Sequence, residues 1–207
     1  MITLLIDTSS SDVSIAILRD SVILSSVIEC IPFKHSVYTV SFIDSVLKKA
    51  KLTPHDVDKI MVVTGPGSFT GLRIGVTIAK VYAYLENINI IPISSLKMRS
   101  ISCDHDYCLS IIDAHHKHFY IGLYDKDNID VVEEHYGDEE EVLDIINKYH
   151  PVIVSDMDGE VGDYSYKKQE LDIEKIVSYY QSAKSFNPHL VNPNYLKKPQ
   201  ALEGAHD

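Results

Sequence analysis

The chain has 207 residues, which is enough for one globular unit or two small lobes. It is 45% hydrophobic and 24% charged, as is ordinary for a folded protein, and no apolar run approaches the roughly 20 residues that span a bilayer. The formal charge of −11 should repel phosphate backbones, which argues against tight nucleic-acid binding by this chain alone.

The cysteines predict a reducing compartment. Cys30, Cys103 and Cys108 are odd in number and contain no CxxC pair, so neither a disulfide framework nor a zinc site is expected. Residues 1–11 lack the basic segment of a signal peptide and are typical of a strand. We therefore expect a cytoplasmic protein without a membrane segment.

The first half of the chain predicts three strands, a helix, a strand and a helix, followed by a short strand. The strands are expected where apolar runs are bounded by turn residues, and the helices where apolar residues recur every three to four positions. This order predicts a mixed sheet with helices packed on it. In chain order the expected elements are 2–7, 13–18, 22–30, 36–50, 59–64, 69–85 and 88–94.

The second half begins with a hairpin that resembles the first. Residues 108–125 can be laid over residues 3–18, which places Asp113 on Asp7, because both segments are an apolar strand ending in Ile-Asp, a turn and a second apolar strand. In the same overlay Ile121 falls on Ile15. The similarity predicts a duplicated lobe, although any two β-hairpins share such a pattern over this length.

The remainder of the second half holds fewer core-forming elements. It predicts an acidic helix over 138–150, a strand over 151–156 and a helix over 173–182, before a tail rich in proline and asparagine that is typical of an irregular strap. We therefore expect an N-terminal lobe over residues 1–103 and a reduced C-terminal lobe with an irregular tail over 104–207.

A glycine-rich loop, GPGSFTGLRIG, joins the strand over 59–64 to the helix over 69–85. A strand, a glycine loop and a helix form many phosphate sites. The loop fits neither common phosphate pattern, because it lacks the lysine of GxxxxGK[ST] and has one residue too many, and a proline, for GxGxxG. A tight turn is the expected alternative, in which Pro66 fixes φ and Ser68 or Thr70 caps the helix.

The helix over 69–85 is apolar on nearly every side, which predicts burial on two sides. An aliphatic flank that contains Ile78 and Val81 suits packing on a sheet. The opposite flank consists of small residues with two apolar neighbours, and it suits the close approach of a helix from this chain or from another. The members of this small flank are Gly71, Leu72, Gly75, Val76, Ala79 and Ala83.

Three further side chains are candidates for a partner contact. Tyr38 and Phe42 lie one turn apart, just outside the core stripe of the helix over 36–50, so they either cover a sheet edge or form an exposed aromatic patch. Arg73 lies in the first turn of the next helix, where its charge opposes the helix dipole. A carboxylate or carbonyl partner for Arg73 is therefore expected, either within the chain or across an interface.

These motifs resemble the TsaB (YeaZ) family. The segments IDTSSSDVSIAI, HS at a helix start, GPGSFTGLRIG, PISSL, IIDAHHKHFYIGLY and PNYLKK stand in that family's order. The resemblance covers residues 2–125 and 193–198, whereas residues 126–190 match only in outline. It implies an α/β fold of the actin-like ATPase (ribonuclease H-like) type, with two related lobes of which the second is reduced.

The resemblance also implies a subunit that is not catalytic by itself. Family members pair with the catalytic subunit TsaD, and the TsaE ATPase and a threonylcarbamoyl-AMP synthase complete the formation of N6-threonylcarbamoyladenosine in tRNAs that read codons starting with A. The helices over 36–50 and 69–85 would form the pairing surface, which a homodimer could also use. The implied interface residues are Tyr38, Phe42, Gly71, Leu72, Arg73, Gly75, Val76, Ala79 and Ala83. No cofactor is implied for the free chain, and ATP or ADP would bind only within the complex.

Two other functions have weaker support. An actin-like small-molecule kinase or ATPase would hold nucleotide with Asp7 and the glycine loop. Actin-like ATPases that bind nucleotide usually carry glycines in the turn of the first hairpin, whereas this turn, DTSSSD, has none. A glycoprotease-type hydrolase is not supported, because no Ser-His-Asp arrangement has local support in the sequence. His115, His116 and His118 are expected to form a solvated turn rather than a metal site. Asp7 and Asp113 are expected to cap turns rather than to form a catalytic carboxylate pair.

Overall fold

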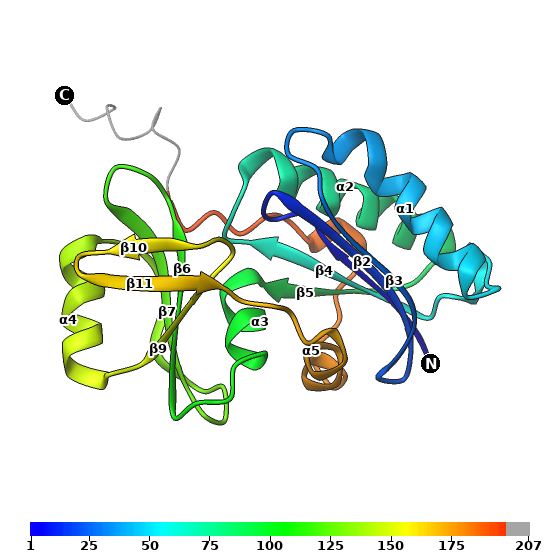
Figure 1. Ribbon diagram of the computed structural model, residues 1–207. Coiled ribbons are helices and arrows are strands. Elements are labelled where there is room, and N and C mark those ends of the chain that lie inside the picture. Colours follow the sequence, from blue (N-terminus) through cyan, green and yellow to red (C-terminus); the bar gives the residue numbers. More distant parts are fainter. Residues whose placement is uncertain (198–207) are drawn as a thin grey trace.

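The first sheet is built around β1 (Ile2–Asp7) in the computed structural model, which describes residues 1–197 (Figure 1). Its strand order is β3-β2-β1-β4-β5. β2 (Asp12–Arg19) and β3 (Val22–Cys30) continue from β1 as antiparallel neighbours, whereas β4 (Lys59–Gly65) and β5 (Ile90–Ser94) run parallel to it. The predicted order of elements in the first half is confirmed.

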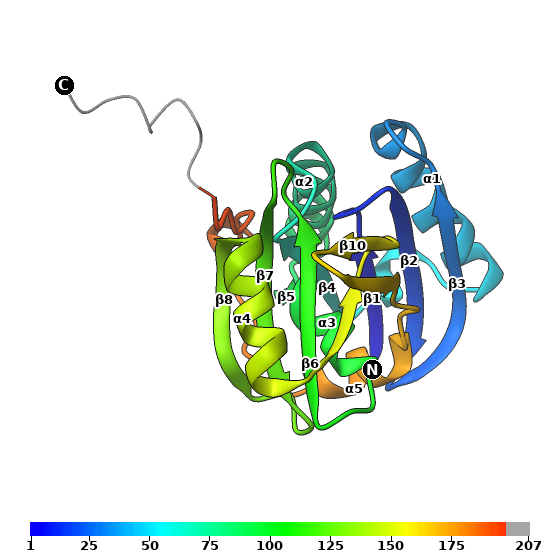
Figure 2. The ribbon, with the colours of Figure 1, turned by 60° about the vertical axis from the view of Figure 1, so that its left-hand side comes forward.

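Helices cover both faces of this sheet because successive strand residues point to opposite sides. α1 (His35–Lys49) and α2 (Phe69–Glu86) lie on one face, and α3 (Ser95–Ile101) and α5 (Ile173–Tyr180) lie on the other (Figures 1 and 2). The core on the α1 and α2 side contains Leu4, and the core on the α3 and α5 side contains its neighbour Leu5. The first sheet is thus buried on both sides.

The second sheet repeats the strand order of the first. Read from β8, the order β8-β7-β6-β9-β11 matches β3-β2-β1-β4-β5, with antiparallel and parallel pairs at the same places. α4 (Glu139–Tyr149) follows β8 as α1 follows β3, and it packs on one face of this sheet (Figure 2). The strands are β6 (Tyr107–Asp113), β7 (His118–Asp125), β8 (Asp130–Asp138), β9 (Val152–Ser155), β10 (Gly159–Val161) and β11 (Tyr164–Lys168).

The second lobe is reduced at the place where the first lobe has its 18-residue helix α2. α2 connects β4 to β5, whereas only the three-residue strand β10 stands between β9 and β11. The repeated strand order and this shortened connection confirm the predicted actin-like fold of two related lobes with a reduced second lobe.

The first hairpins of the two lobes correspond with a shift of one residue. Asp7 pairs with Ser14, so six residues (8–13) lie between them, whereas Asp113 pairs with Phe119 across five residues (114–118). Ile15 therefore corresponds to Tyr120. The predicted overlay of Ile15 on Ile121 is wrong because it allowed no extra residue in the first turn.

After β11 the chain returns to the first lobe. α5 packs in the same core as α3, and Val191 packs in the core beneath α1 and α2. Further on, the backbone N–H of Asn194 donates to the carbonyl of Thr64 at 2.7 Å, beside the end of β4. These residues contact the first lobe although they lie within 104–207, so the sheets do not follow a single cut in the chain. The division at residue 103 stays a prediction.

A partly buried carboxylate joins the two lobes. Glu134 on β8 accepts a hydrogen bond from the hydroxyl of Ser94, at the end of β5, and another from the hydroxyl of Tyr124 at 2.7 Å. Tyr124 is fully buried, and burial together with the nearby charge of Glu134 raises its pKa. Lys97 on α3 adds an ion pair with Asp130 at 2.6 Å. These contacts tie β5 and α3 of the first lobe to β7 and β8 of the second.

Replacing Glu134 with alanine should lower the free energy of unfolding by about 1–3 kcal/mol, because two hydroxyl groups lose their acceptor. Urea denaturation would measure the loss. Glu133→Ala is the matched control, since Glu133 is exposed on the same strand. Equal stability of the two variants would show that Glu134 does not join the lobes.

Candidate partner-binding surface

The glycine loop holds α2 against the β1–β2 turn of its own chain. The hydroxyl of Ser68 accepts the N–H of Gly71 at 3.2 Å, which confirms the predicted cap, and the N–H of Ser68 donates to the carbonyl of Ser9 at 2.7 Å. A Cβ atom on Gly71 would collide with the carbonyl oxygen of Thr8, and Gly67 has a φ of +148°. Main-chain oxygens thus lie beside the helix start, where a phosphate-binding loop would hold its ligand.

The small flank of α2 faces the core of its own chain. Ala79 is 0% exposed and packs with strand residues such as Leu4 and Val62. The proposed contact of this flank with a partner helix is therefore wrong, because the sheet and the β1–β2 turn already cover it. The predicted interface residues that are buried within the chain are Gly71, Leu72, Gly75, Val76, Ala79 and Ala83.

The aliphatic flank of α2 faces outward instead. Val81 is 54% exposed and Leu85 is 72% exposed, whereas Ile74 and Ile78 are partly buried. The predicted orientation of α2, with this flank on the sheet, is wrong. The reason is steric, since Thr8 of the β1–β2 turn approaches the helix so closely that a side chain at Gly71 or Gly75 would collide with it.

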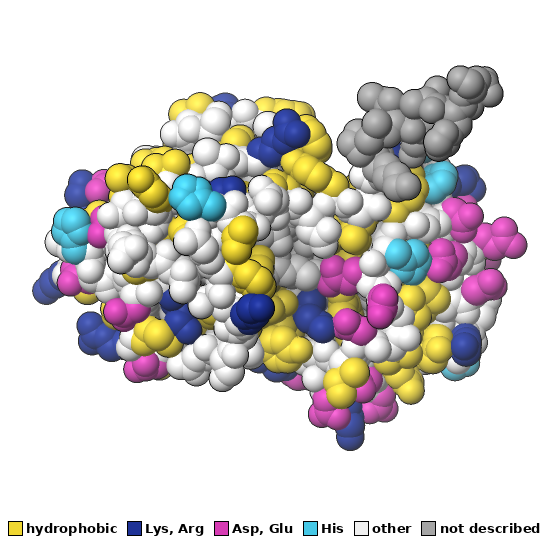
Figure 3. All heavy atoms as spheres, turned by 180° about the vertical axis from the view of Figure 1, so that it is seen from behind, with side chains coloured by type: hydrophobic (Ala, Val, Ile, Leu, Met, Phe, Trp, Pro, Cys, Tyr) yellow, Lys and Arg dark blue, Asp and Glu magenta, His cyan; other side chains and the backbone are white. Residues whose placement is uncertain are grey.

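α1 and α2 together expose large apolar side chains on their outer faces. Tyr38 and Phe42 of α1 stack with ring centroids 5.8 Å apart, and Tyr38 is exposed, whereas Phe42 is partly buried against the core. Val40 on the same helix is exposed as well. Figure 3 shows hydrophobic side chains along the upper edge of the first lobe, whereas acidic side chains gather over the second. We call the following residues the α1–α2 surface: Val37, Tyr38, Val40, Phe69, Val81, Tyr84 and Leu85.

Arg73 has partners within the chain. Its Nε donates to the hydroxyl of Tyr195 at 2.9 Å, and its guanidinium carbon lies 3.9 Å from the centroid of the Phe69 ring. Within the described residues a hydroxyl and a ring thus contact Arg73, and the expected carboxylate or carbonyl partner across an interface stays a prediction. The contact holds the tail motif beside the first turn of α2 and leaves Arg73 exposed at the edge of the α1–α2 surface.

The two strand-end aspartates close matching turns, as predicted. Asp7 accepts the N–H of Ser9 at 2.8 Å, and Asp113 accepts the N–H of His115 at 2.7 Å. The two carboxylates differ in burial, because Asp7 is buried and Asp113 is exposed. Burial raises the pKa of Asp7, although the charge of Arg99 and the hydrogen bonds from Ser9 oppose the rise.

The histidines serve different purposes. His115 and His116 lie in the β6–β7 turn with positive φ, and His118 stacks on Tyr136. Within residues 1–197, no group of His, Cys, Asp and Glu side chains could hold a metal ion. His35 is buried, and its Nε2 lies 2.8 Å from the carbonyl oxygen of Ser10, which ties the start of α1 to the β1–β2 turn.

Among the described residues, 1–197, no helix is both long enough and apolar enough to cross a membrane.

Comparisons with known proteins agree with this architecture. Residues 30–201 match the family described as "TsaD: tRNA N6-adenosine threonylcarbamoyltransferase". A Bacillus subtilis (strain 168) protein named tRNA threonylcarbamoyladenosine biosynthesis protein TsaB is 39% identical over 130 residues, which cover 62% of this chain and 57% of that protein. A protein of the same name from Buchnera aphidicola subsp. Schizaphis graminum (strain Sg) is 29% identical over 97% of both chains.

A solved structure shows the same fold. The crystal structure of an uncharacterized protein with similarity to peptidase YEAZ, from Pseudomonas aeruginosa, superposes with a TM-score of 0.80 at 20% identity and covers 95% of this chain and 99% of that one. The fold and the matched residues define a two-lobed, actin-like protein of the TsaD type. The chain belongs to that family, and the two relatives reported above both carry the name TsaB.

Replacing Ala79 with leucine should lower the free energy of unfolding by about 1–3 kcal/mol, because the flank that it enters is already filled. Thr77→Leu is the matched control, since it adds a leucine to the same helix at an exposed position. Urea denaturation of both variants decides between the two orientations of α2. Equal stability of the Ala79→Leu and Thr77→Leu variants would indicate that the small flank faces outward.

The raised pKa of Asp7 predicts a pH dependence. Ionising a buried carboxyl is costly, so the folded protein loses stability as the pH rises through the folded-state pKa, and this loss is absent below the ordinary carboxyl range. Asp7→Asn removes the titration. The free energy of unfolding of the variant minus that of the parent chain should therefore be larger at neutral pH than at about pH 4.

Asp113→Asn is the matched control for this experiment, because Asp113 makes the same turn hydrogen bond at an exposed position. Urea denaturation of both variants at the two pH values would measure the difference. A pH-independent effect of Asp7→Asn would contradict the assigned role of burial.

Proposed function

We propose that this chain is a non-catalytic subunit that docks on the catalytic subunit TsaD and so supports the formation of N6-threonylcarbamoyladenosine in tRNAs that read codons starting with A. The observation that carries the proposal is the α1–α2 surface. Its large apolar side chains stand on two neighbouring helices of one lobe. Contiguous exposed apolar patches on a folded domain mark sites of protein contact.

The family relation supports the choice of partner. The family that this chain matches is described by the name of the catalytic subunit itself, so TsaD is expected to carry lobes of the same architecture. Two related lobes can present equivalent helices to one another, as the subunits of a symmetric dimer do. A homodimer through the α1–α2 surface is therefore the alternative state of the free chain, and TsaD would replace the second copy.

We further propose that the free chain uses no cofactor and that ATP or ADP binds only within the complex. In support, the carbonyl groups of Thr8 and Ser9 lie against the start of α2, and the N–H of Ser68 is already bonded. TsaE and a threonylcarbamoyl-AMP synthase would complete the pathway. With a formal charge of −11, this subunit would leave tRNA binding to its partner.

Replacing Leu85 with aspartate should weaken docking on TsaD at least about tenfold, because docking would bury an unpaired charge against apolar side chains. The free chain should keep its melting temperature, since Leu85 contributes little to the core. Calorimetric titration with TsaD from the same source would measure the affinity.

Ile129→Asp is the matched control, because Ile129 is a comparably exposed apolar residue in a turn of the other lobe. If the Leu85→Asp variant docks on TsaD as tightly as this control, the α1–α2 surface is not the contact. Sedimentation of the free chain would show in the same samples whether Leu85→Asp also removes a homodimer.

A further inference from the structure

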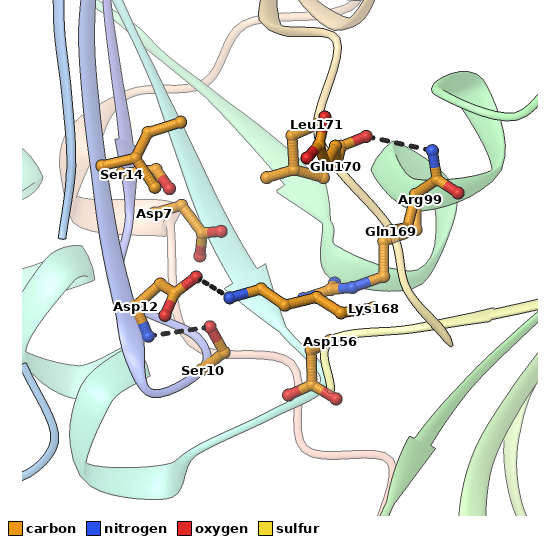
Figure 4. Close-up of a pocket in the computed structure, with 11 residues that line it drawn as sticks. Asp7, Ser10, Asp12, Ser14, Arg99, Asp156, Lys168, Gln169, Glu170 and Leu171 are labelled. Carbon is orange, nitrogen blue, oxygen red and sulfur yellow. Dashed lines mark hydrogen bonds and ion pairs between the residues drawn. The ribbon is translucent and has the colours of Figure 1, made fainter. Parts of the chain in front are cut away.

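A cavity of about 490 Å³ lies between the two lobes, within the size range of small-molecule sites (Figure 4). The β1–β2 hairpin supplies one wall, α3 supplies Arg99, and the end of β11 with the residues after it supplies the opposite wall. The cavity is therefore separate from the α1–α2 surface. The lining side chains are those of Asp7, Ser10, Asp12, Ser14, Ile28, Arg99, Asp156, Lys168, Gln169, Glu170 and Leu171.

The walls carry both signs of charge. Asp7 and Asp12 come from the β1–β2 hairpin, and Lys168 reaches toward them from the opposite side, with Arg99 beside it (Figure 4). Asp156 adds a further carboxylate. An inorganic anion would meet these carboxylates, and a bare cation would meet the ammonium and guanidinium groups. A ligand with separated positive and negative groups avoids both conflicts.

Two buried polar atoms at the cavity have no partner among the described residues. Arg99 is 3% exposed and donates to the carbonyl of Ser95, but its Nε makes no hydrogen bond. Asp12 pairs with Lys168 through one carboxylate oxygen, whereas its Oδ1 is buried and unbonded. Leaving such atoms unpaired is costly, so a ligand that offers an acceptor to Arg99 and a donor to Asp12 would satisfy both.

Lys168 occupies one carboxylate oxygen of Asp12. Its ammonium bonds to Asp12 across the cavity, and its side chain is 48% exposed, so it can leave the carboxylate without disturbing the core. The backbone N–H of Lys168 stays bonded to Asp158 at 2.8 Å, which holds the strand in place while the side chain moves.

We infer that the interlobe cavity binds a small zwitterion, and that an α-amino acid is the class that fits. The carboxylate of the ligand would accept from Arg99, and its ammonium would replace that of Lys168 on Asp12, beside Asp7. Ser10 and Ser14 also line the hairpin wall, and the Ser10 hydroxyl, which accepts the N–H of Asp12, still has a proton to donate to the ligand. Because the ligand would contact both lobes, its binding would fix the lobes relative to each other.

Calorimetric titration of the full chain with each common L-amino acid tests the inference. At least one should bind with a dissociation constant in the millimolar range or tighter. The 2-hydroxy acid that lacks its ammonium, and the amine that lacks its carboxylate, should each bind at least about tenfold more weakly. These comparisons use the unaltered chain. Failure of every amino acid, or equal binding of either analogue, would overturn the proposal.

Variants then locate the site. Asp12→Asn should weaken binding at least about tenfold, whereas Lys168→Ala should bind equally or more tightly because it frees both oxygens of Asp12. Lys167→Ala is the matched control, since Lys167 points to solvent and pairs with Asp158. Unchanged binding by Asp12→Asn, or weaker binding by Lys168→Ala, would contradict the assignment. TsaD docking by Asp12→Asn should be unaffected, so loss of amino-acid binding and loss of docking are separate results.

Discussion

The close packing of α2 on the β1–β2 turn is the constraint on which the rest of the structure depends. A Cβ atom on Gly71 would collide with the carbonyl oxygen of Thr8, and one on Gly67 would collide with that of Ser9. The contact turns the small flank of α2 inward, and the aliphatic flank with Leu85 therefore faces out. It also places main-chain oxygens beside the helix start, where a phosphate-binding loop would hold its ligand. One contact thus creates an apolar outer surface, and it supports the proposal that the free chain binds no nucleotide.

The same turn shapes the space between the lobes. Asp7 precedes the turn, Ser10 lies within it, and both line the interlobe cavity. The carbonyl of Ser10 also lies 2.8 Å from Nε2 of the buried His35 at the start of α1. Burial of Asp7 raises its pKa, so the turn carries an electrostatic cost that a helix-pairing role alone does not require. The β1–β2 turn therefore contacts both the helices of the proposed docking surface and the proposed ligand cavity.

The sequence was sufficient to predict much of the fold, because its signals are local. Apolar runs and helical spacing located the strands and helices of the first lobe, and the repeated Ile-Asp strand ends of Asp7 and Asp113 indicated the duplication. The facing of α2 could not be predicted, because a helix that is apolar on nearly every side has no unique buried face. Small residues beside a glycine loop suit a close sheet as well as a partner helix, and only the position of Thr8 distinguishes them. Glu134 and Lys168 were missed because their partners lie far away in the chain.

The reduction of the second lobe bears on how many partners the chain would bind at once under the proposed function. A complete duplication would have produced a second helix equivalent to α2, and with it a second apolar surface. The chain has only β10 at that position, so α4 covers its sheet without a neighbouring helix to extend an outer face. A chain with one such surface can dock on one partner at a time through it. A homodimer and a complex with TsaD would then exclude each other, and the concentration of TsaD would set how much of the chain is paired with itself.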